Sequence, residues 1–161
     1  MKATMIAALW LLLPIRAFAA PDDTPVSISL ERTVCFGFCP SYIVTLLADG
    51  SVTFEGREYV KTKGVSTKKI DAAKLVPIFK KLEAIHFWEL EDSYRTKKNA
   101  DGSITSVTDL PTKYVTVKTA SKSKKVTDYF GTPAGVDELE QLIDDVAGVS
   151  EWIGDPTERN R

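Results

Sequence analysis

The two cysteines of the chain, Cys35 and Cys39, stand four positions apart in the stretch VCFGFCPSY. Thiols at this spacing can close a structural disulfide, exchange disulfides with another protein, or contribute to a metal site. In an oxidising compartment an adjacent pair normally forms a disulfide. Gly37 supplies the backbone freedom that such a short ring requires. The pattern therefore predicts a Cys35–Cys39 bond that stabilises the fold by about 2 kcal/mol.

A redox role for this pair is the alternative. Thioredoxin-like pairs have CxxC spacing and open a helix, whose N-terminus lowers the pKa of a thiol. Here Pro40 and Tyr42 lead into a predicted strand. Structural zinc needs four closely arranged cysteine or histidine ligands, and His86 is the single histidine. We therefore expect no metal.

Other catalytic signals are also weak. The sequence has no Gly-x-Ser-x-Gly, Walker A or dinucleotide-binding motif. Acidic groups occur at residues 89–92 and at Asp144 and Asp145, and we interpret them as solvated surface carboxylates. We expect no catalytic residue and no cofactor.

Aromatic residues flank the glycine between the cysteines. Phe36 and Phe38 either form an exposed anchor for a partner or tuck over the end of a sheet as core. Tyr42 and Asp109 complete the candidate binding residues. Asp109 either caps its own turn through backbone hydrogen bonds or contacts a ligand.

The first 19 residues are typical of a secretory signal peptide. Lys2 precedes an apolar run over residues 5–13, and Ala17-Phe18-Ala19 gives a small-x-small cleavage site. The run is shorter than the roughly 20 residues that span a bilayer. We expect a periplasmic or secreted protein whose mature chain has no stable membrane span.

Removing the signal peptide leaves 19 basic and 22 acidic residues, a net charge of −3. A weakly acidic protein lacks the basic footprint of nucleic-acid binding. We expect a linker over 20–25, a single domain over 26–150 and a frayed tail over 151–161. The partner is an unknown protein or small ligand, and the domain is expected to be a monomer.

Hydrophobic periodicity predicts the elements that position these residues. Residues 26–30, 42–48, 51–56, 114–119 and 124–130 read as strands, with a type I′ turn at Asp49-Gly50. Helices are predicted over 71–87 and from a Thr132 cap to Gly148, with a polar loop over 95–108. The order β-ββ-α-ββ-α indicates an α+β domain, in which about five antiparallel strands carry two helices on one face.

These spaced motifs resemble a known family. Cys-x-Gly-x-Cys-Pro-x-Tyr at residues 35–42 is followed by Asp49-Gly50, Gly56, Asp109-x-Pro-Thr and the helix over 139–144. Together they are similar to the bacterial family called domain of unknown function 6438, over residues 27–145. The long loop over 97–107 departs from that pattern. The resemblance supports the fold and implies no activity.

Two functional hypotheses follow. The first is a non-enzymatic exported module that binds through the Cys35–Cys39 loop and its aromatic residues. The second is a thiol–disulfide redox protein or sensor that uses the CxxxC pair.

Overall fold

The computed structural model describes residues 24–158, so the predicted signal peptide and most of the linker lie outside the described residues. Within this range the main sheet has seven strands in the order β4-β3-β2-β1-β8-β9-β5. β5 runs parallel to β9, and every other neighbouring pair is antiparallel. The strands are β1 Ser27–Arg32, β2 Ser41–Leu47, β3 Ser51–Glu58, β4 Gly64–Lys69, β5 Ser93–Tyr94, β8 Lys113–Lys118 and β9 Ser123–Asp128.

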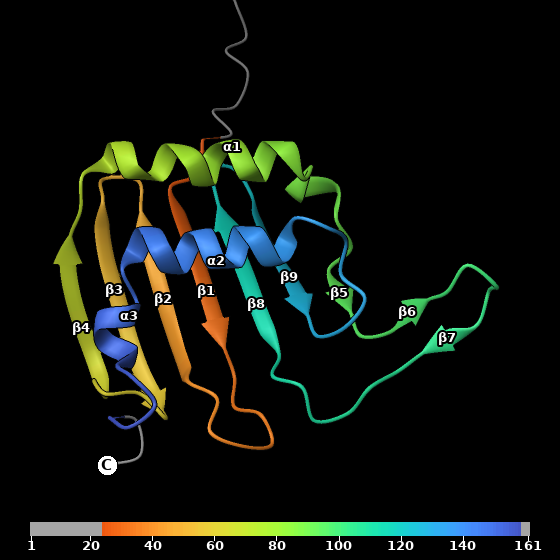
Figure 1. Cartoon of the computed structure of the whole chain (residues 1–161). Helices are drawn as coiled ribbons and strands as arrows, with labels where there is room; N and C mark the ends of the chain where they lie inside the picture. The colour runs from red at the N-terminus through yellow and green to blue at the C-terminus, as the bar shows by residue number, and fades with distance from the viewer. Residues whose placement is uncertain (1–23, 159–161) are drawn as a thin grey trace, which may run out of the picture.

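The helices lie on one side of this sheet (Figure 1). They are the 3₁₀ turns η1 Ala72–Leu75 and η2 Phe87–Glu89 and the α-helices α1 Val76–Ala84, α2 Val136–Ala147 and α3 Ser150–Ile153. This arrangement confirms an α+β domain with helices on one face, but the described residues form three α-helices where the sequence analysis predicted two. No helix between residues 24 and 158 has the length and apolar character to cross a bilayer.

The sheet has two more strands than the five predicted. Sequence analysis missed the two edge strands, β4 and β5, because neither has an alternating hydrophobic pattern. β4 has the sequence GVSTKK and pairs only with β3. β5 has two residues, so it carries no periodic pattern. The predicted polar loop over 95–108 contains a small separate hairpin, formed by β6 Lys97–Lys98 and β7 Ile104–Thr105.

Both α-helices begin later in the chain than predicted, because side chains and glycine near each start form other local structure. Asp71 caps η1 by accepting from the backbone of Ala73, and α1 follows with Pro77 in its first turn, where a missing N–H costs nothing. α2 begins at Val136 after Gly135, not at Thr132. The Thr132 hydroxyl donates to the Asp128 carboxylate instead of capping the helix.

The Asp49-Gly50 hairpin is present, but its turn is not type I′. Gly50 has φ 84°, whereas Asp49 is not among the residues with positive φ. A Cβ at Gly50 would lie 2.2 Å from the Ile70 carbonyl oxygen, because the Ile70 N–H donates to Gly50 at 2.9 Å. Glycine is therefore required for both the turn and this close approach.

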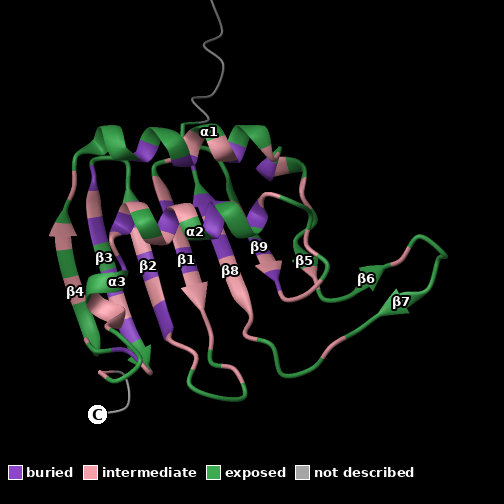
Figure 2. Cartoon of the chain, viewed as in Figure 1, coloured by how far each residue is buried: buried purple, intermediate pink, exposed green. Residues whose placement is uncertain are grey.

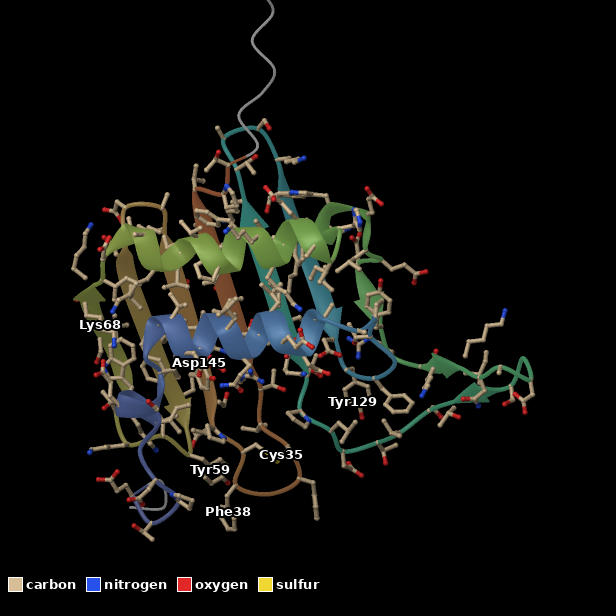
Figure 3. All side chains as sticks on the ribbon, turned by 45° about the horizontal axis from the view of Figure 1, so that its top comes forward. Cys35, Phe38, Tyr59, Lys68, Tyr129 and Asp145 are labelled. Atoms are coloured by element: carbon tan, nitrogen blue, oxygen red, sulfur yellow. A yellow bond between two sulfur atoms is a disulfide. The ribbon has the colours of Figure 1, made fainter. Side chains whose placement is uncertain are left out.

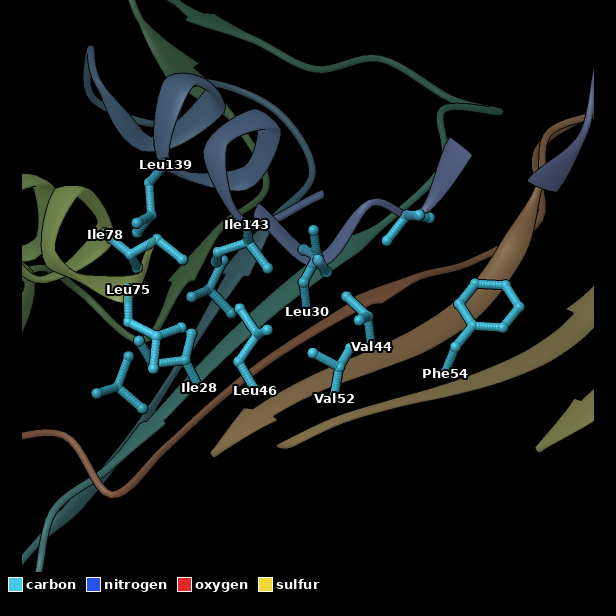
Figure 4. Packing of buried hydrophobic residues seen from close by; sticks show 14 of the residues in the cluster. Ile28, Leu30, Val44, Leu46, Val52, Phe54, Leu75, Ile78, Leu139 and Ile143 are labelled. Carbon is cyan, nitrogen blue, oxygen red and sulfur yellow. The ribbon is translucent and has the colours of Figure 1, made fainter. Parts of the chain in front are cut away.

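The core lies between the helices and the inward side chains of the strands, which alternate with polar residues (Figure 2). Figure 4 shows Ile78 and Leu139 packing towards Ile28 and Leu46 of the sheet. The core extends further along the chain than predicted. Trp152, which the sequence analysis placed in the frayed tail, stacks on Phe54 with ring centroids 5.0 Å apart.

Candidate functional site

The segment between β1 and β2, residues 33–40, contains a ring that the Cys35–Cys39 disulfide closes, and we call this segment the clamped loop. Cys35 and Cys39 are bonded, with their Cα atoms 5.6 Å apart, as the sequence predicts. Gly37 has φ 151°, and its N–H donates to the Cys35 carbonyl at 2.9 Å. The bond and the turn together restrict the conformations of this loop.

The structure decides between the two roles left open for the loop aromatics. Phe36 is 92 % exposed and Phe38 is 69 % exposed, so neither belongs to the core. Phe38 packs edge-on against Tyr59, which follows β3, with ring centroids 5.3 Å apart (Figure 3). Val34 is also about half exposed. The clamped loop therefore presents an apolar surface.

Both stems of the loop are tied to α2 through one carboxylate. Arg32 and Tyr42 are register partners at the ends of β1 and β2. Arg32 donates to Asp144 Oδ2 from Nε at 3.0 Å and from a terminal nitrogen at 2.8 Å. The Tyr42 hydroxyl donates to Asp144 Oδ1 at 2.8 Å. Since Tyr42 is only 1 % exposed, its place in the site is to position the loop and not to touch a partner.

A second group of charged side chains lies between α2 and the sheet. The Lys113 ammonium lies 2.7 Å from Asp128, 2.6 Å from Asp137 and 2.7 Å from Glu140 Oε2. Glu140 also lies 3.9 Å from Arg32, which joins the two groups. We call these six residues the ionic cluster: Arg32, Lys113, Asp128, Asp137, Glu140 and Asp144. It ties α2 to strands β1, β8 and β9.

The cluster holds four acids and two bases, and the pKa values of its acids are shifted to different extents. Burial raises the pKa of Glu140 to about 7, although Lys113 favours its ionised form. Burial likewise raises the pKa of Asp144 against the opposing effects of Arg32 and Tyr42. At Asp128 burial acts in the same direction, but Lys113 and Thr132 hold the pKa below its usual value. Among the described side chains, Glu140 Oε1 is buried without a hydrogen-bond partner. These features single out Glu140 as the group that best tolerates a proton.

Three of the acids have the spacing of a cation site. One oxygen each from Asp128, Asp137 and Glu140 lies within 4.8 Å of the others. The Lys113 ammonium already sits between them and supplies the positive charge. A metal ion would have to displace this ammonium, so we interpret the three acids as the ion-pair partners of Lys113.

Asp109 lies apart from these groups. It is exposed, with φ 66°, in the segment that precedes β8. Thr112, three residues later, is tied to the stem of the clamped loop: the Thr33 N–H donates to the Thr112 carbonyl at 3.0 Å, and the Thr33 hydroxyl accepts from the Thr112 N–H at 2.9 Å.

Sequence analysis missed the ionic cluster, and its interpretation of Asp144 as a solvated carboxylate was wrong. The Asp144 side chain is only 13 % exposed. Helical spacing would have revealed the pattern, because Asp137, Glu140 and Asp144 follow one another at intervals of three and four on one face of a helix. Arg32 continues the inward alternation of Ile28 and Leu30 along β1.

The fold and the site define a small α+β domain in which a disulfide-closed aromatic loop is held by a partly buried ionic cluster. The family model described as Domain of unknown function (DUF6438) matches residues 26–147, and the chain belongs to this family. No curated protein matches the chain. The family description assigns no activity.

Proposed function

We propose that the protein is an exported, non-enzymatic binding module whose contact surface is the clamped loop. Its ligand is a protein with a hydrophobic pocket that receives Phe36, while Val34 and Phe38 lie at the rim. Export is part of the proposal, and it is supported by the signal-like sequence over residues 1–19. Mass spectrometry of the exported protein should find Ala20 at the mature N-terminus. A mature chain that still begins at Met1 would contradict export by cleavage.

The observation that carries this proposal is the 92 % exposure of Phe36 on a covalently closed ring. Burying a phenylalanine side chain contributes about 1.5–3 kcal/mol, so a partner gains substantially from covering it. The disulfide and the anchored stems restrict the loop before binding, which lowers the entropy lost on association. Aromatic residues held in this way are typical binding hot spots.

Replacing Phe36 by alanine should weaken partner binding by roughly 30-fold or more, because a hot-spot side chain is worth at least about 2 kcal/mol. A photo-crosslinking residue at position 36 would first identify the partner, and calorimetry with the purified partner would then give the affinity. Ile104→Ala is the matched control, since Ile104 is 70 % exposed on the separate hairpin. Equal affinities for the two variants would overturn the proposal. Phe36→Ala should leave the unfolding free energy within about 0.5 kcal/mol of the original.

The redox alternative is separated from this proposal by the behaviour of the disulfide. A structural bond should have a reduction potential below roughly −300 mV, whereas exchange-active bonds lie near −120 to −200 mV. We expect the lower range, because the ring leads into β2 and not into a helix. The double variant Cys35→Ser/Cys39→Ser should lose about 2 kcal/mol of unfolding free energy. Alkylation and intact mass across a graded thiol buffer give the potential, and a value in the higher range would favour the redox function.

A further inference from the structure

One face of the main sheet carries the helices, and the opposite face is open over residues 24–158 (Figure 1). Successive side chains of a strand point to opposite faces, so the residues between the core positions lie on this open face. On β1 these are Ser27, Ser29 and Glu31, which alternate with the buried Ile28 and Leu30. The strands that contribute in this way have six to eight residues each: β1, β2, β3, β4, β8 and β9.

The strand register sorts these side chains into three rows that cross the sheet. The middle row consists of hydroxyl residues and ends in a lysine: Thr67, Thr53, Thr45, Ser29, Thr116 and Lys125. The row nearer the clamped loop, which we call the acidic row, contains Val65, Glu55, Ile43, Glu31, Tyr114 and Thr127. The row at the other end, which we call the basic row, contains Lys69, Ser51, Leu47, Ser27, Lys118 and Ser123.

The two outer rows carry opposite charge. In the acidic row, Glu31 and Glu55 share one cation, because Arg57 lies 2.8 Å from the first and 3.1 Å from the second. One negative charge remains uncompensated there. In the basic row, Lys69 pairs with Asp49 in the adjoining turn. The Lys118 ammonium has no acidic partner within the part of the chain that the structure describes, so the basic row keeps a positive charge.

A second copy of the same face complements this pattern when a two-fold axis runs along the middle row. Such an axis reverses the strand direction, so each acidic-row residue faces the residue four positions away on the same strand of the second copy. Ile43 then faces Leu47, which is 42 % exposed in the single chain. The Glu31 carboxylate faces the Ser27 hydroxyl, and Lys118 lies one strand further, about 4.8 Å away. An axis along the strands would instead place one acidic row on the other.

The area of the face is sufficient for a weak dimer. Strands about 4.8 Å apart, with a rise of about 3.3 Å per residue, give roughly 500 Å² for each copy. Two copies therefore bury roughly 1,000 Å², which is about the lower limit for a specific interface. An antiparallel sheet can leave one face to solvent. Solvation alone does not require acids, bases and apolar residues to match across one symmetry axis.

We propose that two copies of the chain associate through their open sheet faces, about a two-fold axis along the middle row. The interface is isologous, since the same rows of both copies meet each other. This dimer differs from the monomer expected from the sequence, because only the strand register reveals the rows. The two clamped loops lie at opposite ends of the dimer and remain accessible. The proposal does not depend on the proposed function.

Sedimentation velocity from micromolar to millimolar concentration tests the proposal. We expect a reversible dimer with a dissociation constant in the micromolar range. Glu31→Lys and Lys118→Glu should each weaken association at least tenfold, because each variant brings like charges together at two symmetric contacts. Glu138→Lys and Lys80→Glu are the matched controls, since both residues are exposed on the helical layer. These controls should leave the association unchanged.

Mixing the two interface variants gives the sharpest result. In a mixed pair of Glu31→Lys with Lys118→Glu, both contacts again join one acid and one base. The mixture should therefore associate at least tenfold more tightly than either variant alone. A mixture of Glu138→Lys with Lys80→Glu carries the same net charges and should show no gain.

Three outcomes would reject the dimer. The original protein could stay monomeric at millimolar concentration. The interface variants could associate as tightly as the original protein. The mixture of interface variants could show no gain over its components, which would place any self-association on another surface.

Discussion

Asp144→Ala is expected to lower the free energy of unfolding by about 3 kcal/mol, because removing one partner leaves buried charge uncompensated. Asp144 accepts two hydrogen bonds from Arg32 and one from Tyr42. Without it, a largely buried guanidinium and a buried hydroxyl both lose their acceptor. Urea unfolding followed by tryptophan fluorescence measures the change.

The adjacent Asp145 provides the control for this variant. Asp145 is exposed on the same helix, and its carboxylate accepts a hydrogen bond from Gln141, one turn earlier. Asp145→Ala should change the unfolding free energy by less than about 0.5 kcal/mol. Tyr42→Phe, which removes only the hydroxyl, should cost about 1 kcal/mol. A loss below about 1 kcal/mol for Asp144→Ala would show that the carboxylate does not hold the loop stems to α2.

The same variant links stability to the proposed function. Asp144 contacts both residues that flank the clamped loop, so its loss should loosen the loop even where the sheet stays folded. Partner affinity should therefore fall in Asp144→Ala and persist in Asp145→Ala. This result would identify Asp144 as a positioning residue for the loop.

The second large effect is a dependence of stability on pH that originates at Glu140. Its pKa is about 7 in the folded protein and 4.5 as an ordinary glutamate. Between these values the folded state binds more protons at Glu140 than the unfolded state, so the contribution of Glu140 to stability is fully present below pH 4.5 and is lost as pH rises to about 7. The expected loss is roughly 3 kcal/mol, from 1.36 kcal/mol per pKa unit. The charged groups that face this carboxylate are Lys113, Arg32, Asp128 and Asp137.

Glu140→Gln should remove this part of the pH dependence, because glutamine does not titrate. Relative to the original protein, the variant should gain stability between pH 4.5 and 7.5, as measured by urea unfolding at closely spaced pH values. Glu138→Gln is the matched control on the exposed side of the same helix, where Glu138 pairs with Lys81. It should keep the original slope. Parallel pH profiles for Glu140→Gln and the original protein would contradict a raised pKa at Glu140.

Local patterns predicted the parts of this protein that depend on neighbours in sequence. Alternation identified β1, β2, β3, β8 and β9, and helical spacing identified α1 and α2. The spacing of Cys35 and Cys39 around Gly37 predicted the disulfide ring. These features follow from side-chain periodicity and short-range geometry, which a single chain carries in its sequence.

Edges and boundaries were predicted less well. β4 and β5 have no hydrophobic alternation, since each pairs with the sheet on one side only. Thr132 carries the side chain of a helix cap, yet its hydroxyl is used by Asp128 after the chain folds. Trp152 lies close to the C-terminus, and only the position of Phe54 across the core makes it part of the fold.

The sequence by itself determined the α+β class, the disulfide ring and the family. Only the tertiary structure decided that Phe36 faces solvent while Tyr42 is buried, because that choice depends on where the end of the sheet lies. The tertiary structure also determined the ionic cluster, in which Arg32 contacts Asp144 although the two residues are 112 positions apart in the chain. Burial and charge pairing are properties of residues distant in sequence, so they arise only when the helices pack on the sheet.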